Sequence, residues 1–526
     1  MLGAEYFAAP EDGADGEEFR SASRASAAAL DQREDVVRYK DRFALRITDQ
    51  TPHDVMVQNL LFLRGVLDSA GVDYLLVRGN DERPVVAVDV KDRPRLRQAL
   101  VDAAVGEPFY VKPMDTKKKT VQLLADGELS SRRNARVLRL FRPHYSAEAK
   151  LYYGAGTGVQ VELWEFGADE IRLPIENSLT RRTVPANEAV RGTVERFGTT
   201  WPTIENMFAD HAIDIDFEID MIFSWVDGTD EEYRRIRASY MAGAVVGEGD
   251  AHEARFRQVD ELKYALRSVH MYAPWVRNIY IATDSRPPAW LAEHPRVRLV
   301  RSEEFFADTS ALPIYNSQAV EAQLHRIEGL SEHYLYSNDD MFFGRPVGPA
   351  LFFSPGGITK FVENETRIGL GENSAERSGF ENAARVNRRL LWERFGRITT
   401  RHLQHCAAPL RRSVVAEMEQ EFPAEFARTA SSRFRAADNI SVTNSLYHYY
   451  ALLTGRAVTQ ETARTEYVDT TTRSGLQQME KLLGRRSLDM FCLNDGSFPE
   501  VPGPERAERM TEFLERYYPI RAPWEK

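Results

Sequence analysis

Two adjacent carboxylates, Asp339 and Asp340, follow Asn338 where the apolar run YLYS ends in the stretch YLYSNDDMFFGRP. Adjacent carboxylates repel one another, so a pair between two apolar runs is costly unless a cation lies between the pair and a ligand. Mg²⁺ in particular is usually held by one or two carboxylates together with substrate phosphates. The pair therefore predicts a metal and diphosphate site, with Asn338 as a substrate-binding neighbour and Asp340 also a candidate general base. A solvated acidic turn is the alternative.

A second polar group follows the apolar stretch IDMIFSWV, which begins at residue 219. This stretch is too short to span a membrane and is stopped by Asp-Gly-Thr-Asp, so it predicts a strand buried on both faces. Ligands of open α/β sheets bind in the crevice outside the carboxyl ends of the strands. We therefore expect Trp225 and Gly228 to contact substrate and Asp227 to be a further candidate base, although an ordinary Asp-Gly turn has the same pattern.

Two pairs of arginines precede predicted helices. Arg255 and Arg257 come just before a helix that Pro274 ends, and Arg433 and Arg435 alternate in the sequence SSRFR. Guanidinium groups near a helix N-terminus are placed to meet an anion, because the backbone N–H groups and the helix dipole act in the same direction. The four arginines are therefore candidate phosphate ligands. For Arg255 and Arg257, an equally good interpretation is that they are solvated and form ion pairs with neighbouring carboxylates.

Single residues complete the candidate site. His405 could act as a general base or donate a hydrogen bond to a diphosphate, since histidine titrates near neutral pH. An exposed loop that it shares with His402 is the alternative. Asn316 stands near the start of the helix that leads into the carboxylate strand. Asn494 and Asp495 end the short apolar run FCL, a pattern that an ordinary Asn-Asp-Gly turn also gives.

The composition is that of a globular chain. Its 526 residues are 43% hydrophobic and 28% charged, and the chain is long enough for two or three domains. A net charge of −11 and a pI near 5.7 argue against a nucleic-acid-binding protein. Two cysteines, Cys406 and Cys492, imply no disulfide framework. The sequence shows neither a signal peptide nor an apolar window of membrane-spanning length. We therefore expect a cytoplasmic protein without an integral membrane segment, with peripheral association at the inner face of the membrane as a variant of this expectation.

The order of these patterns divides the chain into five parts. Residues 1–34 have few large apolar side chains and are expected to form a disordered tail. Residues 35–185 mix helical and strand patterns, which predicts a smaller accessory α+β domain, and residues 186–218 are expected to form a linker. Strand and helix alternate from residue 219 to 345, which predicts a mostly parallel sheet with flanking helices. The catalytic domain of this α/β class is expected to cover residues 219–500. Residues 501–526 are expected to add a closing amphipathic helix.

Four blocks of the sequence resemble the conserved regions of the Stealth family, in the family's order. They are IDMIFSWVDGTDEEY, the stretch from ARFRQVDELKY through SNDDMFFGRPV, the stretch from HCAAPLRRSVV through YHYYALLTGRAV, and FCLNDG. Together they cover about residues 218–500. The family includes bacterial capsule and exopolysaccharide phosphotransferases and the α/β subunit of the animal GlcNAc-1-phosphotransferase. Where the family pattern has a proline two residues after the histidine, this chain has Ala407.

The resemblance implies a nucleotide-sugar transferase-like fold and a defined reaction. A sugar-1-phosphate would move from a nucleotide sugar such as UDP-GlcNAc to a sugar hydroxyl of a polysaccharide or other glycan. Mg²⁺ or Mn²⁺ would be the cofactor, and a nucleoside monophosphate would be released. The resemblance also implies that Asn494 and Asp495 join Asp339 and Asp340 at the metal.

The candidate residues fit this chemistry, because such a transfer needs a metal, further cations and a base. Two other functions stay open at this point. A metal-dependent glycosyltransferase would release a nucleoside diphosphate from the same kind of site, and a binding module would have no activity. No particular oligomeric state is indicated.

Overall fold

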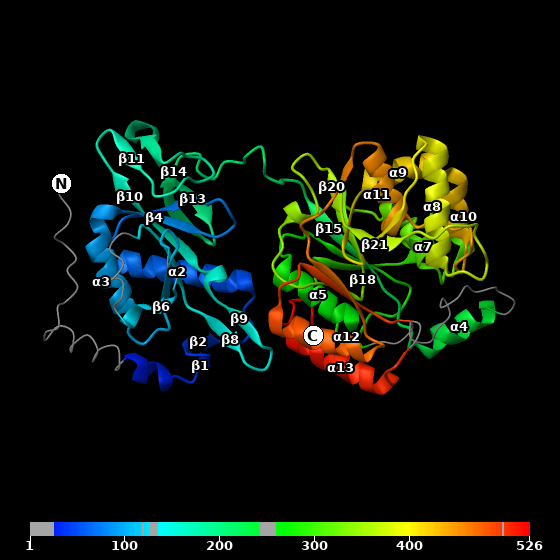
Figure 1. Cartoon of the computed structure of the whole chain (residues 1–526), viewed down its shortest axis with the longest axis horizontal. Helices are drawn as coiled ribbons and strands as arrows, with labels where there is room; N and C mark the ends of the chain where they lie inside the picture. Colours follow the sequence, from blue (N-terminus) through cyan, green and yellow to red (C-terminus); the bar gives the residue numbers. More distant parts are fainter. Residues whose placement is uncertain (1–25, 118–119, 127–134, 242–258, 497–498) are drawn as a thin grey trace. The chain divides into compact units, whose positions relative to one another are not determined.

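Two compact units, Met1–Asp210 and His211–Lys526, make up the computed structural model of the chain (Figure 1). The structure describes residues 26–117, 120–126, 135–241, 259–496 and 499–526. Residues 1–25 of the expected disordered tail therefore lie outside the described residues. The rest of that segment does not fit the expectation, because residues 26–31 are helical and Leu30 is fully buried in the core of the first unit.

The first unit is built from two larger β-sheets, a hairpin and two long helices. One sheet has four strands in the order β1-β2-β8-β9. The other has eight, with β12-β11-β10-β7-β5-β6 in line, β4 beside β10, and β3 beside β4. Neighbouring strands are mostly antiparallel, which matches the predicted α+β class. The elements are β1 (Val36–Tyr39), β2 (Arg42–Arg46), α2 (Pro52–Ser69), β3 (Tyr74–Val77), β4 (Val85–Asp89), α3 (Arg93–Ala103), β5 (Tyr110–Pro113), β6 (Gln122–Leu123), β7 (Val137–Phe141), β8 (His144–Ser146), β9 (Leu151–Tyr153), β10 (Val159–Phe166), β11 (Glu170–Arg172), β12 (Thr183–Pro185), β13 (Arg191–Arg196) and β14 (Thr199–Ile204).

Local sequence explains where α2 begins and which face it buries. The Thr51 hydroxyl accepts a hydrogen bond from the Asp54 backbone N–H, and the Asp54 carboxylate accepts one from the Thr51 N–H. Pro52 then occupies the first helical position, where no backbone N–H is needed. Leu60 and Leu63 follow at helical spacing and are fully buried in the core. Capping and apolar spacing together therefore place this helix against the sheet.

The segment expected to be a linker, residues 186–218, instead contributes a hairpin to the first unit. Strands β13 and β14 pair antiparallel, and Phe197 and Gly198 join them in a tight turn with φ values of 53° and 74°. Positive φ at both turn positions gives the twist that two-residue hairpins require. Trp201 of β14 is fully buried in the core of this unit. The linker prediction is therefore corrected, and the boundary between the units falls near Asp210.

Replacing Trp201 tests whether this hairpin belongs to the core. The indole ring is fully buried, its Nε1–H donates to the Arg196 carbonyl over 2.9 Å, and the Arg64 guanidinium lies 4.8 Å from the ring centre. We expect Trp201→Ala to lower the free energy of unfolding of the first unit by about 3–5 kcal/mol. Hydrogen exchange of the full chain, followed on peptides from the first unit, measures this loss. Val190→Ala is the control in the same segment, because Val190 is 49% exposed and its loss is expected to cost less than about 0.5 kcal/mol. Equal, small effects of the two changes would contradict the assignment.

A five-stranded sheet forms the centre of the second unit, in the order β17-β16-β15-β18-β23. Strands β15 to β18 are parallel, and β23 runs antiparallel at the edge. This confirms the predicted α/β fold with a mostly parallel sheet and flanking helices. The elements are β15 (Ile219–Ser224), α4 (Glu231–Met241), α5 (Glu261–Tyr272), β16 (Ile279–Ala282), β17 (Val297–Val300), α6 (Ser302–Phe305), α7 (Ser317–Glu321), β18 (His333–Asn338), β19 (Met341–Phe343), β20 (Thr359–Phe361), β21 (Glu363–Arg367), α8 (Gly379–Phe395), β22 (Arg401–Leu403), β23 (Ala408–Arg411), α9 (Arg412–Glu421), α10 (Pro423–Ser431), α11 (Tyr447–Leu453), β24 (Ala457–Thr459), β25 (Thr465–Asp469), α12 (Arg473–Arg485), β26 (Met490–Asn494) and α13 (Gly503–Tyr517).

A smaller sheet, in the order β19-β26-β25, completes the frame around the acidic pair. Strand β18 of the large sheet ends at Asn338, and β19 of the small sheet begins at Met341. Asp339 and Asp340 therefore form the connection between the two sheets. β19 pairs antiparallel with β26, which places Met341 opposite Cys492. The acidic pair is thus held between two sheets rather than in an open loop.

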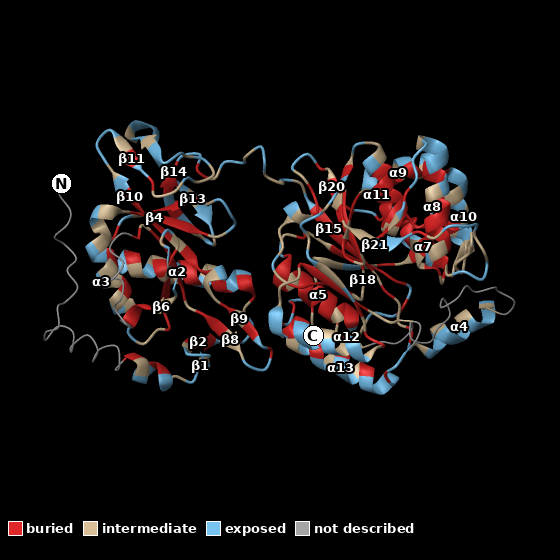
Figure 2. Cartoon of the chain, in the orientation of Figure 1, coloured by how far each residue is buried: buried red, intermediate tan, exposed pale blue. Residues whose placement is uncertain are grey.

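Helix α13 lies within residues 501–526, the segment expected to add a closing helix. Tyr517 and Tyr518, where this helix ends, donate hydrogen bonds to the carbonyl groups of Gly344 and Phe343. Buried residues recur at helical spacing among exposed ones along α13, so this helix is amphipathic (Figure 2). None of the helices among the described residues combines the length and the apolar character that crossing a bilayer requires.

The buried carboxylate of Asp220 connects the amino ends of β15, β16 and β18 through hydrogen bonds. Asp220 of β15 is fully buried, and its oxygens accept hydrogen bonds from Arg277 Nε over 2.8 Å and Nη2 over 2.6 Å. The backbone N–H groups of Asn278 and Ser331 donate to the same carboxylate over 3.1 and 2.8 Å. A buried charge is tolerated when it is paired and hydrogen-bonded in this way. Asp220 is therefore a structural carboxylate, and its bonds hold β15, β16 and β18 in register.

Candidate active site

A cavity of about 810 Å³ lies at the carboxyl ends of β15, β16 and β18 in the second unit. This is the edge of the sheet at which ligands bind in open α/β folds. Nine residues proposed from the sequence line this cavity: Trp225, Asn316, Asn338, Asp339, Asp340, His405, Arg435, Asn494 and Asp495. The fold therefore collects residues that are far apart in the chain into one site.

Asp340 has an incomplete set of hydrogen bonds although it is enclosed. Its Oδ2 accepts a hydrogen bond from Asn494 Nδ2 over 3.1 Å and lies 3.5 Å from the Cys492 thiol. Its Oδ1 is buried and has no hydrogen-bond partner among the described residues. Burial raises the pKa of Asp340, and the nearby His405 opposes that increase. In Asp220, the structural carboxylate, both oxygens accept hydrogen bonds from protein groups. Asp340 Oδ1 differs in this respect, and an unpaired buried oxygen of this kind indicates a position for a ligand or ion.

Asp339 lies in a cluster of negative charge. Burial raises its pKa well above the usual range, and the carboxylates of Asp340, Glu261 and Asp495 raise it further. Glu261 belongs to the first turn of α5 and was not proposed from the sequence. Repulsion among these groups is relieved if a cation binds between them or if a carboxylate holds a proton.

The donor atoms of this cluster fit a hard divalent cation. Carboxylate and amide oxygens, such as those of Asp339, Asp340 and Asn494, are the ligands that Mg²⁺ and Mn²⁺ prefer. Within the described ranges, no three His, Cys, Asp or Glu side chains are arranged as a complete metal-binding group. A cation bound here would therefore take the rest of its ligands from substrate oxygens and water.

His405 lies in the loop between β22 and β23. Its Nδ1 is buried, with no hydrogen-bond partner in the part of the chain that the structure describes. Burial lowers the pKa of His405, and the Asp340 carboxylate opposes that decrease. The lowered pKa favours the neutral imidazole at neutral pH, so the ring can accept a proton there. The Tyr467 ring lies edge-on, with 5.7 Å between the ring centres.

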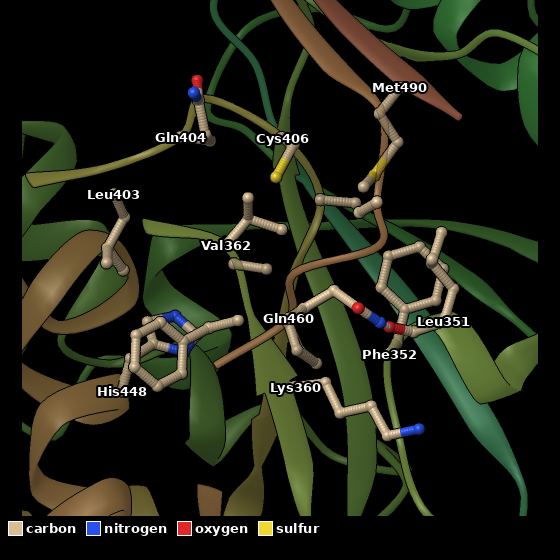
Figure 3. A pocket seen from close by; sticks show the side chains of 15 residues that line it. Leu351, Phe352, Lys360, Val362, Leu403, Gln404, Cys406, His448, Gln460 and Met490 are labelled. Carbon is tan, nitrogen blue, oxygen red and sulfur yellow. Dashed lines mark hydrogen bonds between the residues drawn. The ribbon is translucent and has the colours of Figure 1, made fainter. Parts of the chain in front are cut away.

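Neighbouring residues hold the loop that carries His405. His402 stacks on Phe380, with 4.5 Å between the ring centres. Cys406 is a buried free thiol that lines a small hollow together with Met490 of β26 (Figure 3). The hollow measures about 10 Å³, which leaves room for no more than about one water molecule. It is therefore a packing contact that fixes the loop and not a second ligand site.

Asn316 and Arg435 are held at the wall of the cavity by hydrogen bonds. Asn316 caps α7, because its Oδ1 accepts from the Gln318 N–H over 3.1 Å, and its Nδ2 donates to Asn439 Oδ1 over 2.8 Å. The amide of Asn316 is therefore used by the fold itself. Arg435 Nη2 donates to Ser317 Oγ over 3.0 Å, which positions its guanidinium beside the start of α7.

Asp227 and Gly228 form the ordinary turn that was named as the alternative for them. Asp227 Oδ1 accepts hydrogen bonds from the backbone N–H and the hydroxyl of Thr229, over 2.9 and 2.6 Å. The Gly228 carbonyl accepts one from Arg234 Nε over 2.7 Å. Neither residue lines the cavity. The structure therefore does not bring Asp227 and Gly228 into the cavity with the other candidate residues.

Arg433 also takes a structural position. Its Nε and Nη2 donate to the carbonyl oxygens of Pro313 and Ala311, over 2.9 and 3.1 Å, and the residue does not line the cavity. The structure therefore does not bring Arg433 into the cavity with Arg435. Arg255 and Arg257, the other candidate phosphate ligands, lie outside the described residues.

Asp495 lines the cavity, but protein groups occupy both of its carboxylate oxygens. Thr470 Oγ1 donates to Oδ1 over 2.8 Å, and Arg506 Nη2 lies 3.3 Å from Oδ2. Both side chains of this ion pair are largely buried. The predicted role of Asp495 as a metal ligand therefore has less support than those of Asp339, Asp340 and Asn494.

Two further carboxylates line the cavity and were not proposed from the sequence. Asp284 follows β16 and accepts hydrogen bonds from the N–H and hydroxyl of Ser302, over 2.8 and 2.7 Å. Glu321 of α7 is buried, and Thr443 Oγ1 donates to it over 2.7 Å; burial raises its pKa. Asp284 ends the run NIYIATD just as Asp227 ends its own apolar run, so the same strand-end pattern could have identified it.

A carboxylate cluster, a partly buried histidine and an arginine at the carboxyl edge of a mostly parallel sheet define an α/β enzyme suited to group transfer. Three models of the Stealth family match the chain in order. These are Stealth protein CR2, conserved region 2, over residues 255–361; CR3, conserved region 3, over residues 404–452; and CR4, conserved region 4, over residues 480–526.

Curated relatives match nearly the whole chain. Exopolysaccharide phosphotransferase CpsY of Mycobacterium leprae is 57% identical over 476 residues, which are 90% of this chain and 88% of the relative. CpsY of Mycobacterium tuberculosis is 56% identical over 491 residues, 93% of this chain and 92% of the relative. The exopolysaccharide phosphotransferase of Nocardia farcinica is 52% identical over 473 residues, 90% and 88% of the two chains. The chain belongs to the Stealth family, which confirms the resemblance seen in the sequence.

Solved structures give a weaker likeness. The galactosyltransferase LgtC, in complex with donor and acceptor sugar analogs, is 12% identical, covers 56% of this chain and 95% of its own, and gives a TM-score of 0.28. The apo structure of the bifunctional glycosyltransferase WbbM is 11% identical, covers 62% and 54%, and gives a TM-score of 0.31. Likeness at this level supports no conclusion about fold or reaction.

Proposed function

We propose that this enzyme transfers a sugar-1-phosphate from a nucleotide sugar, UDP-GlcNAc or a similar donor, to a hydroxyl group of a polysaccharide. The bond that forms joins the acceptor oxygen to the phosphorus next to the sugar. The bond that breaks joins that phosphorus to the oxygen bridging the two phosphates, so a nucleoside monophosphate leaves and a phosphodiester remains. The curated relatives named exopolysaccharide phosphotransferases support this class of reaction.

The placement of Asp340 and His405 in one cavity is the observation that carries this proposal. A buried carboxylate oxygen without a partner among the described residues interacts electrostatically with an imidazole whose Nδ1 is buried and whose pKa is lowered. Transfer to a hydroxyl needs a group that takes the hydroxyl proton and a positive centre that stabilises charge on the phosphate oxygens. The neutral imidazole suits the first task, and the carboxylate cluster suits the binding of a cation for the second.

His405 is the proposed general base. In this mechanism His405 accepts the proton of the acceptor hydroxyl as the oxygen attacks phosphorus, and the resulting imidazolium is stabilised by the Asp340 carboxylate. Asp227, the other base considered from the sequence, is engaged in its turn with Thr229 and does not line the cavity. The proposed base is therefore His405, and Asp340, which lines the same cavity, stabilises its protonated form.

The proposed cofactor is Mg²⁺ or Mn²⁺, held by Asp339, Asp340 and Asn494. The unsatisfied Oδ1 of Asp340 and the raised pKa of Asp339 support this position. When bound, the cation would supply positive charge to the diphosphate oxygens of the donor. The protein groups themselves orient the site, because Asn494 Nδ2 holds Asp340 Oδ2 and leaves Oδ1 for the ligand.

Arg435 is the described arginine that we propose to contact the donor phosphates. Arg435→Lys is expected to raise the KM for the donor or lower kcat by roughly tenfold, because an ammonium group cannot reproduce the paired hydrogen bonds of a guanidinium. Initial rates over a range of donor concentrations measure the effect. Arg433→Lys is the matched control, since its guanidinium bonds carbonyl groups outside the cavity. Unchanged kinetics of Arg435→Lys would remove Arg435 from the donor site.

Product analysis tests the reaction itself. The purified chain is incubated with a panel of UDP-sugars, Mn²⁺ and glycan acceptors, and the nucleotide products are separated. We expect UMP together with a phosphodiester-linked glycan. Release of UDP would instead identify a metal-dependent glycosyltransferase. Donor binding without either product, across the whole panel, would favour a binding module.

A further inference from the structure

Three large apolar side chains are exposed in one region of the second unit. Leu370 is 88% exposed, Ile398 is 63% exposed and Trp392 is 57% exposed. Single exposed apolar residues are common, but a group of them within one region indicates a surface that another molecule covers. We name the region formed by Leu370, Trp392 and Ile398, with Arg389 and Arg397, the basic apolar patch.

Hydrogen bonds show that the three apolar residues come from neighbouring segments. Strands β21 and β22 pair antiparallel, and beyond that pairing the Ile368 N–H donates to the Thr400 carbonyl over 3.0 Å. Leu370 and Ile398 each lie two residues from these partners, on adjacent stretches. Arg388 of α8 donates to the Gly369 carbonyl over 3.0 Å, and Trp392 follows Arg388 by one helical turn. The patch is therefore assembled from α8 and the two extended segments beside it.

The charge of this region is opposite to that of the whole chain. Residues 367–401 contain eight arginines and four glutamates, with no lysine or aspartate, whereas the full chain has a net charge of −11. Arg389 is exposed and pairs with Glu393 at 3.9 Å, an exposed contact that neutralises little of its charge. Arg397 is exposed, and no described carboxylate forms an ion pair with it. Positive charge is thus available beside the exposed apolar side chains.

We propose that the basic apolar patch binds the surface of a bilayer that contains anionic lipids. Tryptophan favours the boundary between lipid headgroups and hydrocarbon, and aliphatic side chains such as Leu370 and Ile398 gain by leaving water for the acyl region. Arginine guanidiniums pair with lipid phosphates. Leu370 and Ile398 themselves offer no hydrogen-bonding group to the hydroxyls of a sugar polymer. Charge complementarity and apolar exposure together therefore favour a lipid surface.

The position of the patch relates it to the cavity of the proposed active site. Asn364 and Thr366 of β21 line that cavity, as do Ser378 and Phe380 where α8 begins. Helix α8 continues from there to Arg389 and Trp392, and the segment that follows β21 leads to Leu370. A bilayer bound at the patch would therefore lie against elements that also form the cavity wall, and a substrate carried by the membrane could reach the site. This last consequence rests on the proposed function, but binding to the bilayer does not.

Vesicle sedimentation with the full chain tests the proposal. Phosphatidylcholine vesicles are compared with vesicles of phosphatidylcholine and phosphatidylglycerol, without substrates. We expect binding to the anionic vesicles that weakens as salt increases. The triple change Leu370→Ser, Trp392→Ser and Ile398→Ser is expected to weaken binding at least tenfold. The double change Arg389→Gln and Arg397→Gln is expected to weaken binding to a similar degree and to reduce its dependence on salt.

The controls separate the patch from general stickiness and from catalysis. Val105→Ser and Ile213→Ser alter exposed apolar residues elsewhere and are expected to leave vesicle binding unchanged. The triple variant is expected to keep its transfer rate on a soluble acceptor, so loss of binding and loss of activity are distinguishable. Failure of the unmodified chain to bind anionic vesicles, or equal binding by the triple variant, overturns the proposal. So does an oligomer of the unmodified chain that light scattering finds lost in the triple variant, because a second copy would then cover the patch.

Discussion

Asp340→Asn is expected to lower kcat by roughly two orders of magnitude or more while the protein stays folded. The amide has the shape of the carboxylate and can still accept a hydrogen bond from Asn494 Nδ2, so the fold is retained. It lacks the charge that, in the proposed mechanism, holds a cation and stabilises a protonated His405. Loss of electrostatic stabilisation of a transferring group has this order of effect. Steady-state rates with saturating donor and Mn²⁺ measure it.

Asp220→Asn is the informative comparison, because both carboxylates are buried in the same unit. Asp220 is fully hydrogen-bonded, so its change is expected to cost about 2 kcal/mol or more in the free energy of unfolding and to leave the kcat of the folded enzyme close to normal. Asp340→Asn is expected to lower kcat and to leave the free energy of unfolding close to normal. Full activity of the unmodified enzyme in excess EDTA would refute the metal part of the proposal, and near-normal kcat of Asp340→Asn would refute its electrostatic part.

His405→Gln is expected to lower kcat/KM by roughly 10² to 10⁴ and to flatten the acidic limb of the pH profile. The base is active when the imidazole is neutral, so kcat/KM falls as the pH drops through the pKa of His405 in the free enzyme. Burial lowers that pKa from its ordinary value of 6.5, so the limb is expected below pH 6.5. Glutamine keeps a polar side chain of similar size but cannot take up the proton. The profile of kcat/KM on the acidic side of neutrality measures both effects.

His402→Gln is the matched control for this change. His402 also lines the cavity, but its ring stacks on Phe380 and it lies 3.5 Å from Glu381. We expect its replacement to preserve the acidic limb. If His405→Gln loses activity and the limb persists, the proton acceptor is a carboxylate, with Asp340 as the described candidate. If both histidine variants behave like the unmodified enzyme, the loop between β22 and β23 serves packing alone.

The large sheet could be predicted from local sequence because its strands carry a local pattern. Each of β15, β16 and β18 is a mostly apolar run followed by polar residues, and segments with helical spacing separate the runs. Their order along the chain, with helical connections, predicts parallel pairing and therefore the edge at which ligands bind. The same pattern therefore predicts that the carboxylates at the ends of these strands lie at the ligand-binding edge.

The pairing of β19 with β26 could not be predicted in the same way. Asp340 and Asn494 are separated by 154 residues, and pairing over such a distance depends on tertiary packing, which a local pattern does not contain. The resemblance to a family implied that these residues share a site, but the residues themselves did not. The hairpin of β13 and β14 was missed for a different reason, because Phe197 supplies one of its two positive φ angles and phenylalanine is not a usual turn residue.

Asp227 shows how local chemistry can override a strand-end pattern. It follows an apolar strand just as Asp284 does, but Thr229, two residues further on, engages its carboxylate in a local turn. Asp284 is bonded to Ser302 and still lines the cavity. The direction of a side chain after a strand is therefore set by the partner that the following loop supplies, which sequence spacing alone does not determine.

The hydrogen bond between Asn494 and Asp340 can form only late in the synthesis of the chain. The amide that orients the carboxylate is encoded 154 residues after it. At a synthesis rate of roughly 5–20 residues per second, about 8–30 s separate the appearance of the two residues on the ribosome. During that interval β19 has no partner strand, although every strand of the large sheet up to β18 has been made. The contacts that orient Asp340 in the proposed site are therefore completed only when β26, the last strand among the described residues, has been made.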